Sequence, residues 1–207
     1  MRDNSSRRLV HVSMVAFGFL IGYLTPLFIS LAAFTAFLFN LFFLDKWTKG
    51  KLKKEAHSKR DLGLLLYPGS LTLISLIFFD QQIYMAIAWG AMAFGDASAA
   101  TVGRQLKGQK WPWNPSKTLL GSLAFWLLGS ILGVCMLYCL PRSIFLGLSF
   151  SEWIPIVIVA VGIAALVETL PALIDDNFSV PLTAALVAFF LRACEAYGTY
   201  FFPENVW

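Results

Sequence analysis

The chain has 207 residues, of which 58% are hydrophobic and only 14% are charged. Soluble domains carry about 25% charged residues, so this composition excludes a water-soluble globule and predicts an integral membrane protein. Since a transmembrane helix needs about 20 apolar residues, the chain has room for about eight spans. No length remains for a separate soluble domain, and we expect a single transmembrane domain that comprises residues 1–207.

Seven apolar runs follow one another along the chain, each of a length and composition typical of a transmembrane helix. They predict an all-α, polytopic membrane protein with spans at about 9–24, 26–44, 62–79, 83–102, 118–140, 153–170 and 180–202. Very short polar turns separate the first span from the second and the third from the fourth. Such short turns favour antiparallel neighbouring helices.

The basic residues are concentrated in segments that seven alternating spans would put on one side of the membrane. The N-terminal tail and the loops after the second and fourth spans hold 14 of the 16 Lys and Arg. Because Lys and Arg accumulate in cytoplasmic loops, we expect the N-terminus in the cytoplasm and the C-terminus outside. The basic run 46–60 is typical of an anchor to anionic lipid, with a nucleotide-attracting surface as the alternative. We expect the lipid bilayer as a partner and no nucleic acid, and the sequence indicates no oligomeric state.

The fourth span contains an acid, Asp96, whose neighbours are nearly all small residues. An ionisable residue within a span is costly and is by default a functional hypothesis. A rise of 1.5 Å per residue puts Asp96 roughly 9 Å from a helix end near Val102. Small neighbours such as Gly95 allow a ligand or another backbone to come close, while a hydrogen bond between helices is the structural alternative.

The segment between the fourth and fifth spans has the parts of a phosphate site. Asn114 or Ser116 is expected to cap the fifth helix, with Pro115 at the helix start and Lys117 in its first turn. Free backbone N–H groups, the positive end of the helix dipole and a lysine together favour phosphate binding. Arg104 adds a positive charge on the same side, and an ordinary cap with an interfacial lysine is the alternative.

A third group of polar residues lies between the last two spans. Glu168 ends the sixth helix, and Asp175, Asp176 and Asn177 precede the seventh. Together with Asp96 these acids fall on the cytoplasmic side, where the phosphate site is expected. Mg²⁺ is held by one or two carboxylates together with substrate phosphates, so this convergence favours a site that handles a nucleoside triphosphate. Helix capping is the alternative for the pair of acids before the seventh helix.

The N-terminal segment places Arg8 and His11 one helical turn apart at the inner end of the first span. Either residue can contact phosphate from that position, and the imidazole can also act as a base. The alternative for His11 is an interfacial anchor.

These residues occur in an order and spacing that resemble the CTP-dependent lipid kinases, namely dolichol kinase, phytol kinase and the CTP-using diacylglycerol kinase. The resemblance rests on Gly95-Asp96, Gly103, Lys117-Thr118, Gly121, Glu168-Thr169-Leu170-Pro171, Asp175-Asp176-Asn177 and Val180-Pro181, preceded by Arg7-Arg8-Leu9-Val10-His11. It implies an enzyme that moves the γ-phosphoryl group of CTP, with Mg²⁺, onto the hydroxyl of a membrane lipid alcohol.

Residue roles follow from combining the resemblance with the chemistry of the side chains. The residues expected to act in catalysis are Asp96, Lys117, Glu168 and Asp176. Those expected to contact the nucleotide or its phosphates are Gly95, Gly103, Arg104, Lys117, Thr118, Asn177, Arg8 and His11. Those expected to hold Mg²⁺ are Asp96, Glu168, Asp175 and Asp176. Asp96 is also the preferred acceptor of the hydroxyl proton.

The acceptor and the membrane depend on the same resemblance. An isoprenoid alcohol of the dolichol, polyprenol or phytol type is preferred because the basic-then-His opening resembles the phytol kinase branch, and diacylglycerol is the alternative. The active site is expected on the cytoplasmic face. The membrane is expected to be the plasma or inner membrane in a prokaryote and the endoplasmic reticulum or a plastid membrane in a eukaryote.

Two other function classes are less favoured. Phosphatidate cytidylyltransferase also uses CTP, but its signature contains a His-Gly-Gly stretch, and the only histidines here are His11 and His57. A small transporter would account for Arg192 and Glu195 in the seventh span. Transporters tend to bind at the bilayer midplane between repeated halves, whereas here the other acids gather at one face and no internal repeat is evident.

Overall fold

The computed structural model describes residues 16–43, 62–106, 108–171 and 175–201, and helices dominate this part of the chain. In chain order the helical elements are η1 (Ile21–Tyr23), α2 (Pro26–Phe42), α4 (Leu62–Ile77), α5 (Gln82–Gly90), η2 (Ala91–Asp96), α6 (Ala97–Leu106), α7 (Leu119–Cys139), η3 (Arg142–Ile144), α8 (Phe150–Thr169) and α9 (Asp176–Phe201). The mainly helical fold is confirmed. A strictly all-α fold is wrong at one point, because β1 (Lys110–Trp111) and β2 (Asn114–Thr118) form an antiparallel hairpin.

Three of the described helices are long and apolar enough to cross a membrane: α7, α8 and the part of α9 from Asp176 to Glu195. Helices α2 and α4 are apolar but shorter. Large apolar side chains are exposed along these helices, among them Leu123 and Ile131 of α7 and Phe190 of α9. Contiguous exposed apolar surface is typical of a protein that contacts lipid. Residues 9–15 of the expected first span, 9–24, lie outside the described residues.

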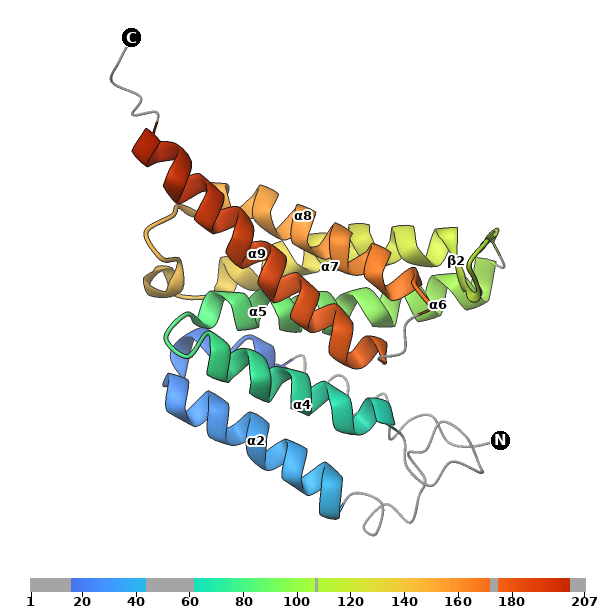
Figure 1. Ribbon diagram of the computed structural model, residues 1–207, viewed down its shortest axis with the longest axis horizontal. Coiled ribbons are helices and arrows are strands. Elements are labelled where there is room, and N and C mark those ends of the chain that lie inside the picture. Colours follow the sequence, from blue (N-terminus) through green and yellow to red (C-terminus); the bar gives the residue numbers. More distant parts are fainter. Residues whose placement is uncertain (1–15, 44–61, 107, 172–174, 202–207) are drawn as a thin grey trace.

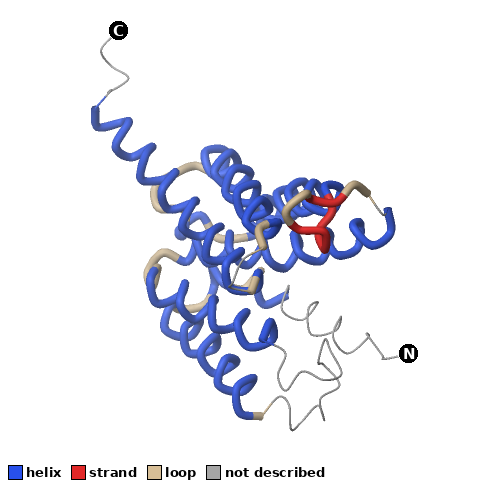
Figure 2. Tube along the Cα trace, turned by 45° about the vertical axis from the view of Figure 1, so that its right-hand side comes forward, coloured by secondary structure: helices blue, strands red, loops and turns tan. Residues whose placement is uncertain are grey.

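The helices form two layers that α9 connects (Figure 1). Helices α2 and α4 pack as a pair, while α5, η2, α6, α7 and α8 form a second group, and α9 crosses both. The chain reverses direction from one long helix to the next. The hairpin, the end of α8 and the start of α9 therefore lie at one end of the bundle, and the loop between α7 and α8 lies at the other (Figure 1; Figure 2).

The expected helix 83–102 exists, but it runs from Gln82 to Leu106 and consists of three parts. Its middle part, η2, is a π-helix that ends at Asp96. Segments of π-helix are rare and occur frequently at functional sites. Because α6 continues for ten residues beyond Asp96, this carboxylate lies about 15 Å from the helix end, deeper than the sequence indicates.

Glycines allow η2 to approach α7 closely. A Cβ atom on Gly95 would overlap the ring of Phe125, and one on Gly129 would lie 3.3 Å from the Cα of Gly95. Small residues at such a contact let two helix backbones come together in a membrane. The small neighbours of Asp96 thus serve, at least at Gly95, the approach of another helix.

At the opposite end of the bundle, Arg192 of α9 is tied to the loop that precedes α8. Its Nη2 atom donates a hydrogen bond to the carbonyl oxygen of Leu146 at 3.0 Å. Leu146 has a φ of 52°, a left-handed conformation that is uncommon for a residue other than glycine. The contact gives Arg192 a structural partner in this loop.

Candidate active site

The hairpin, and not a helix start, carries the predicted phosphate-binding segment. Residues 114–118 form β2, so the expected cap at Asn114 or Ser116 and the expected helix start at Pro115 are wrong. The side chain of Asn114 instead accepts hydrogen bonds from the backbone N and the Oγ of Ser116, at 3.2 and 2.6 Å. Asn commonly makes such local bonds two residues along the chain, and they stabilise turns and extended segments in place of a helix. Lys117 therefore lies near the end of a strand.

Thr118 is the actual cap of α7. Its Oγ1 accepts a hydrogen bond from the backbone N of Gly121 at 3.0 Å. Replacing Thr118 with alanine is expected to cost about 1 kcal/mol of stability and so to lower the thermal midpoint of the purified protein in detergent. Thr118→Ser keeps the hydroxyl oxygen and is expected to retain most of this stability. An equal decrease in both variants would contradict the capping role.

Two tryptophans tie the hairpin to the helices beneath it. The indole nitrogen of Trp111 donates to Ser122 Oγ at 2.9 Å, and that of Trp113 donates to Thr169 Oγ1 at 3.3 Å. The two rings lie 4.7 Å apart. Sequence reasoning missed this anchoring role, although Trp-Pro-Trp-Asn-Pro, with its turn residues, is a hairpin signal.

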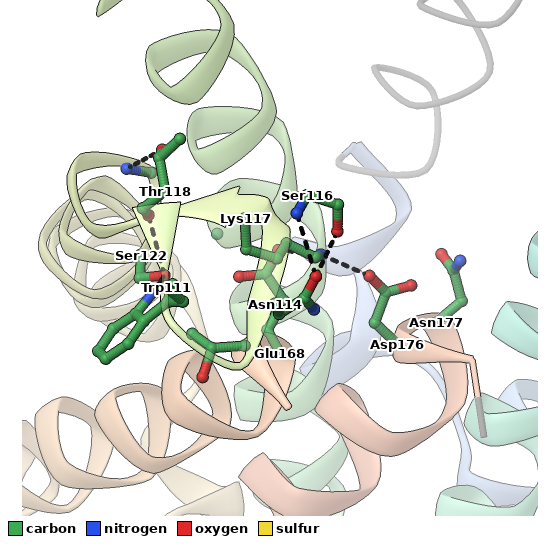
Figure 3. A network of polar contacts seen from close by, with 12 residues as sticks. Trp111, Asn114, Ser116, Lys117, Thr118, Ser122, Glu168, Asp176 and Asn177 are labelled. Atoms are coloured by element: carbon green, nitrogen blue, oxygen red, sulfur yellow. Dashed lines mark hydrogen bonds and ion pairs between the residues drawn. The ribbon is translucent and has the colours of Figure 1, made fainter. Parts of the chain in front are cut away.

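Lys117 joins three elements at the site (Figure 3). Its Nζ atom lies 2.6 Å from Glu168 Oε1, in the last turn of α8, and 2.7 Å from Asp176 Oδ2, at the first residue of α9. The side chain of Glu168 is only 4% exposed, whereas that of Asp176 is 35% exposed. A buried carboxylate is costly unless it is paired, and Lys117 supplies the pairing.

The electrostatics keep Lys117 in its charged form. Burial lowers the pKa of the Lys117 ammonium, but the attraction of Glu168 and Asp176 outweighs burial, and the pKa lies above its usual value of 10.5. The side chain is therefore a cation at neutral pH, suited to contact an anion and unsuited to act as a base. Two carboxylates and one ammonium leave a net negative charge that favours a metal cation.

Asp96 lies close to this group. It is half-buried at the end of η2, and it is near enough to Glu168 for their charges to interact. The four residues expected to act in catalysis, Asp96, Lys117, Glu168 and Asp176, thus lie at the same end of the bundle. They come from four different elements, which the alternating direction of the helices brings together.

The acidic segment before the last helix is divided between a cap and a helical turn. Asp175 Oδ1 accepts hydrogen bonds from the backbone N and the Nδ2 of Asn177, at 2.9 and 2.7 Å. Helix α9 begins at Asp176 and not near residue 180, so Asp176 and Asn177 lie in its first turn. Figure 3 shows Asn177 beside Asp176. Asp175 has the capping role that the sequence left open as an alternative.

The structure also describes Gly103 and Arg104, two further residues expected to contact phosphate. A Cβ on Gly103 would lie 2.9 Å from Thr118 Oγ1, so Gly103, like Gly95, is at a close contact with a neighbouring element. Arg104 is exposed on α6. Arg8 and His11 lie outside the described residues.

The carboxylates fit a Mg²⁺ ion only in part. Among the residues that the structure describes, no three His, Cys, Asp or Glu side chains converge closely enough to hold a metal, so Asp96, Asp175, Asp176 and Glu168 do not form a protein cage. Glu168 and Asp176 nevertheless contact the same nitrogen atom. Mg²⁺ usually binds one or two carboxylates together with substrate phosphates and water, and this pair fits that mode.

Curated relatives of the chain are named as phytol kinases. It is 32% identical over 199 residues to "Probable phytol kinase 3, chloroplastic" of Glycine max, which covers 88% of this chain and 61% of that protein. It is 35% identical over 130 residues to "Probable phytol kinase 1, chloroplastic" of Glycine max, which covers 62% of this chain and 43% of that protein. It is 30% identical over 129 residues to "Phytol kinase 1, chloroplastic" of Arabidopsis thaliana, and this match covers 61% of this chain and 42% of that protein.

The chain thus spans 42–61% of the length of these three relatives. No family model and no solved structure matches it. The longer of the two Glycine max matches nevertheless covers most of the chain, and the matches agree with the family to which the motifs point. The chain is therefore a homologue of the phytol kinases, and its resemblance to the group of lipid kinases that contains them is confirmed.

Proposed function

We propose that the chain is a lipid kinase that transfers the γ-phosphoryl group of CTP to the hydroxyl of an isoprenoid alcohol in the membrane. The observation that carries the proposal is Lys117, held between Glu168 and Asp176 at one end of an apolar helical bundle, in a chain whose curated relatives are named phytol kinases. The choice of CTP as donor rests on the family resemblance.

The residues of the site divide the work of phosphoryl transfer, which depends mainly on positioning and on neutralising charge. The Lys117 ammonium contacts phosphate oxygens, and Arg104 adds positive charge at the end of α6. Glu168 and Asp176 are the ligands we assign to Mg²⁺, which when bound would neutralise charge on the phosphates. Asp96 accepts the proton of the alcohol. The tail of the alcohol stays in the bilayer, so the protein needs no aqueous pocket for it.

We further propose seven spans with the N-terminus and the active site on the cytoplasmic side. The direction of the described helices supports this orientation, because α2 ends and α4 begins at the same end of the bundle as the hairpin (Figure 1). The basic segments that flank these helices in the sequence are then expected on the same side of the membrane as the site. This side is the cytoplasmic one, because Lys and Arg accumulate in cytoplasmic loops. The relatives' names include "chloroplastic", which favours a plastid membrane where the host cell has plastids.

The purified protein in mixed micelles is expected to phosphorylate phytol or a polyprenol from CTP, and chelation of Mg²⁺ is expected to stop the reaction. CTP and ATP are each to be tested as donors, with phytol, polyprenol and diacylglycerol as acceptors, by following the transfer of labelled γ-phosphate. Equal rates with ATP would contradict the choice of donor. Preferred phosphorylation of diacylglycerol would contradict the choice of acceptor.

Asp96→Asn keeps the size of the side chain and removes its basic oxygen. It is expected to reduce the phosphorylation rate by about 10²-fold or more, the contribution typical of general base catalysis. The matched control is Asp80→Asn, because Asp80 is an exposed acid in the turn between α4 and α5, at the other end of the bundle. Activity of Asp96→Asn near that of the parent would exclude Asp96 as the base.

A further inference from the structure

Three of the helices that the structure describes contain an internal proline: Pro68 in α4, Pro155 in α8 and Pro181 in α9. Proline has no N–H group, so the carbonyl four residues earlier loses its helical donor. In a membrane such a carbonyl needs a donor from elsewhere, because lipid offers none. The carbonyls freed in this way are those of Leu64, Ser151 and Asn177.

Two of these carbonyls receive a side-chain donor from the neighbouring helix. Asn40 Nδ2 of α2 donates to the carbonyl oxygen of Leu64 at 2.6 Å. Ser70 Oγ of α4 donates to the carbonyl oxygen of Asn177 at 3.2 Å. Ser151 differs, since it lies in the exposed first turn of α8. The two prolines thus create acceptors that connect α2 to α4 and α4 to α9.

The Ser70 hydroxyl has two acceptors but a single proton. Its Oγ lies 2.7 Å from the carbonyl oxygen of Tyr67 in its own helix, in addition to the contact with Asn177. The Tyr67 carbonyl has the amide of Leu71 in the helical register, whereas the Asn177 carbonyl has lost the amide at position 181. Ser70 is fully buried, so water does not replace it as the donor to Asn177.

We propose that Ser70 is a positioning residue for the phosphate site. By substituting for the missing amide of Pro181, it holds the first turn of α9 where Asp176 reaches Lys117. Asp176 directly precedes Asn177 in this turn, and its Oδ2 lies 2.7 Å from Lys117 Nζ. Glu168 comes from α8 and meets Lys117 independently of Ser70. The effect of Ser70 on catalysis rests on the proposed function, whereas its effect on the contact between Asp176 and Lys117 does not.

Cross-linking of Lys117 tests the positioning directly. A membrane-permeant carbodiimide activates a carboxylate, which then forms an amide with an amine in contact with it. The reaction is carried out on the full chain in detergent, and mass spectrometry of the peptides after digestion distinguishes the Lys117–Asp176 product from the Lys117–Glu168 product. Because an unsatisfied buried carbonyl shifts the turn toward other donors, Ser70→Ala is expected to lower the Asp176 product about threefold relative to the Glu168 product. If Ser70→Ala fails to fold, Ser70→Cys keeps a similar volume with a weaker donor.

A double-mutant cycle with Pro181→Ala tests the mechanism. Alanine at position 181 restores the helical N–H donor to Asn177, so removing the Ser70 hydroxyl is expected to change the cross-link ratio much less in that background. Ser75→Ala is the matched control. Ser75 is also buried in α4, but its hydroxyl donates to the Thr72 carbonyl of the same helix, and its loss is expected to leave the ratio unchanged.

An unchanged ratio in Ser70→Ala, an equal decrease in Ser75→Ala, or an equal effect of Ser70→Ala in both backgrounds would overturn the proposal. The cross-link needs neither nucleotide nor alcohol, so its outcome is separate from the test of kinase activity. In the active protein, Ser70→Ala is also expected to raise the Mg²⁺ concentration for half-maximal rate. Ser75→Ala is expected to leave this concentration unchanged.

Discussion

Replacing Lys117 with methionine is expected to reduce phosphoryl transfer strongly and to lower the thermal stability of the protein. Methionine keeps most of the length of the side chain but removes the ammonium that pairs with Glu168 and Asp176. Removing one partner of a buried ion pair costs about 3–5 kcal/mol, because the other charge is left buried and unpaired. Since the Lys117 side chain is 24% exposed, we expect the lower end of this range.

The kinetic loss is expected to be larger than the loss of stability alone explains. Removal of a group that stabilises charge in the transition state reduces the rate by about 10²–10³-fold. Lys117→Arg keeps the charge but presents a planar fork in place of a point charge, so we expect intermediate activity and near-parental stability. Rates and thermal midpoints are to be measured on the same preparations in detergent.

Lys110→Met is the matched control for Lys117→Met. Lys110 is an exposed residue of β1 in the same hairpin, so its replacement removes the same charge from this hairpin without removing a partner of the carboxylates. We expect parental stability and a rate within about threefold of the parent, as for most surface substitutions. If the two methionine variants lose activity equally, the overall positive charge of the hairpin matters and the ion pairs of Lys117 do not.

Hydropathy predicted the approximate positions of the described apolar helices α2, α4, α7, α8 and α9, because each of them contains a long apolar run in the sequence. It did not predict the starts of α8 and α9. Helix α8 begins at Phe150, where Ser149 and Glu152 form a capping box, and α9 begins at Asp176. At both starts polar residues satisfy backbone N–H groups, and a search for apolar runs excludes such residues.

The predicted helix start at Asn114, Pro115 and Ser116 is wrong for a different reason. Asn114, Pro115 and Ser116 are all favourable at a helix start, and local preference alone cannot distinguish that role from a turn and strand. Contact with other elements determines that this segment forms a strand, since the indole groups of Trp111 and Trp113 donate hydrogen bonds to α7 and α8. Tertiary contacts of this kind have no periodic signal in the sequence.

The assembly of the site was predictable in outline, since alternating spans place Asp96, Lys117, Glu168 and Asp176 at one end of the bundle. The sequence does not specify which carboxylates contact Lys117. That depends on the rotation and tilt of α8 and α9, which are set by side-chain packing between helices. The sequence also does not predict the π-helical segment that ends at Asp96, because this segment changes the hydrogen-bond register without changing the apolar composition of the span.

Gly95→Ala is expected to reduce the proposed phosphoryl transfer strongly, although it adds a single methyl group. The new Cβ would overlap the ring of Phe125, which is fully buried. Overpacking of this kind costs about 1–3 kcal/mol. Because Gly95 directly precedes Asp96, η2 must shift away from α7 and carry the carboxylate with it. A misplacement of about 1 Å at a reacting group can reduce the rate about 10²-fold.

Gly133→Ala in α7 is the matched control, because its Cβ would meet Val157 Cγ1 at 3.5 Å, an ordinary van der Waals distance. We expect it to retain most of the parental rate and thermal midpoint. Phe125→Leu removes part of the ring that the new methyl group would strike, so adding it to Gly95→Ala is expected to restore activity and stability, with strong non-additivity. Full activity of Gly95→Ala alone, or no recovery in the double variant, would show that the contact of η2 with α7 does not position Asp96.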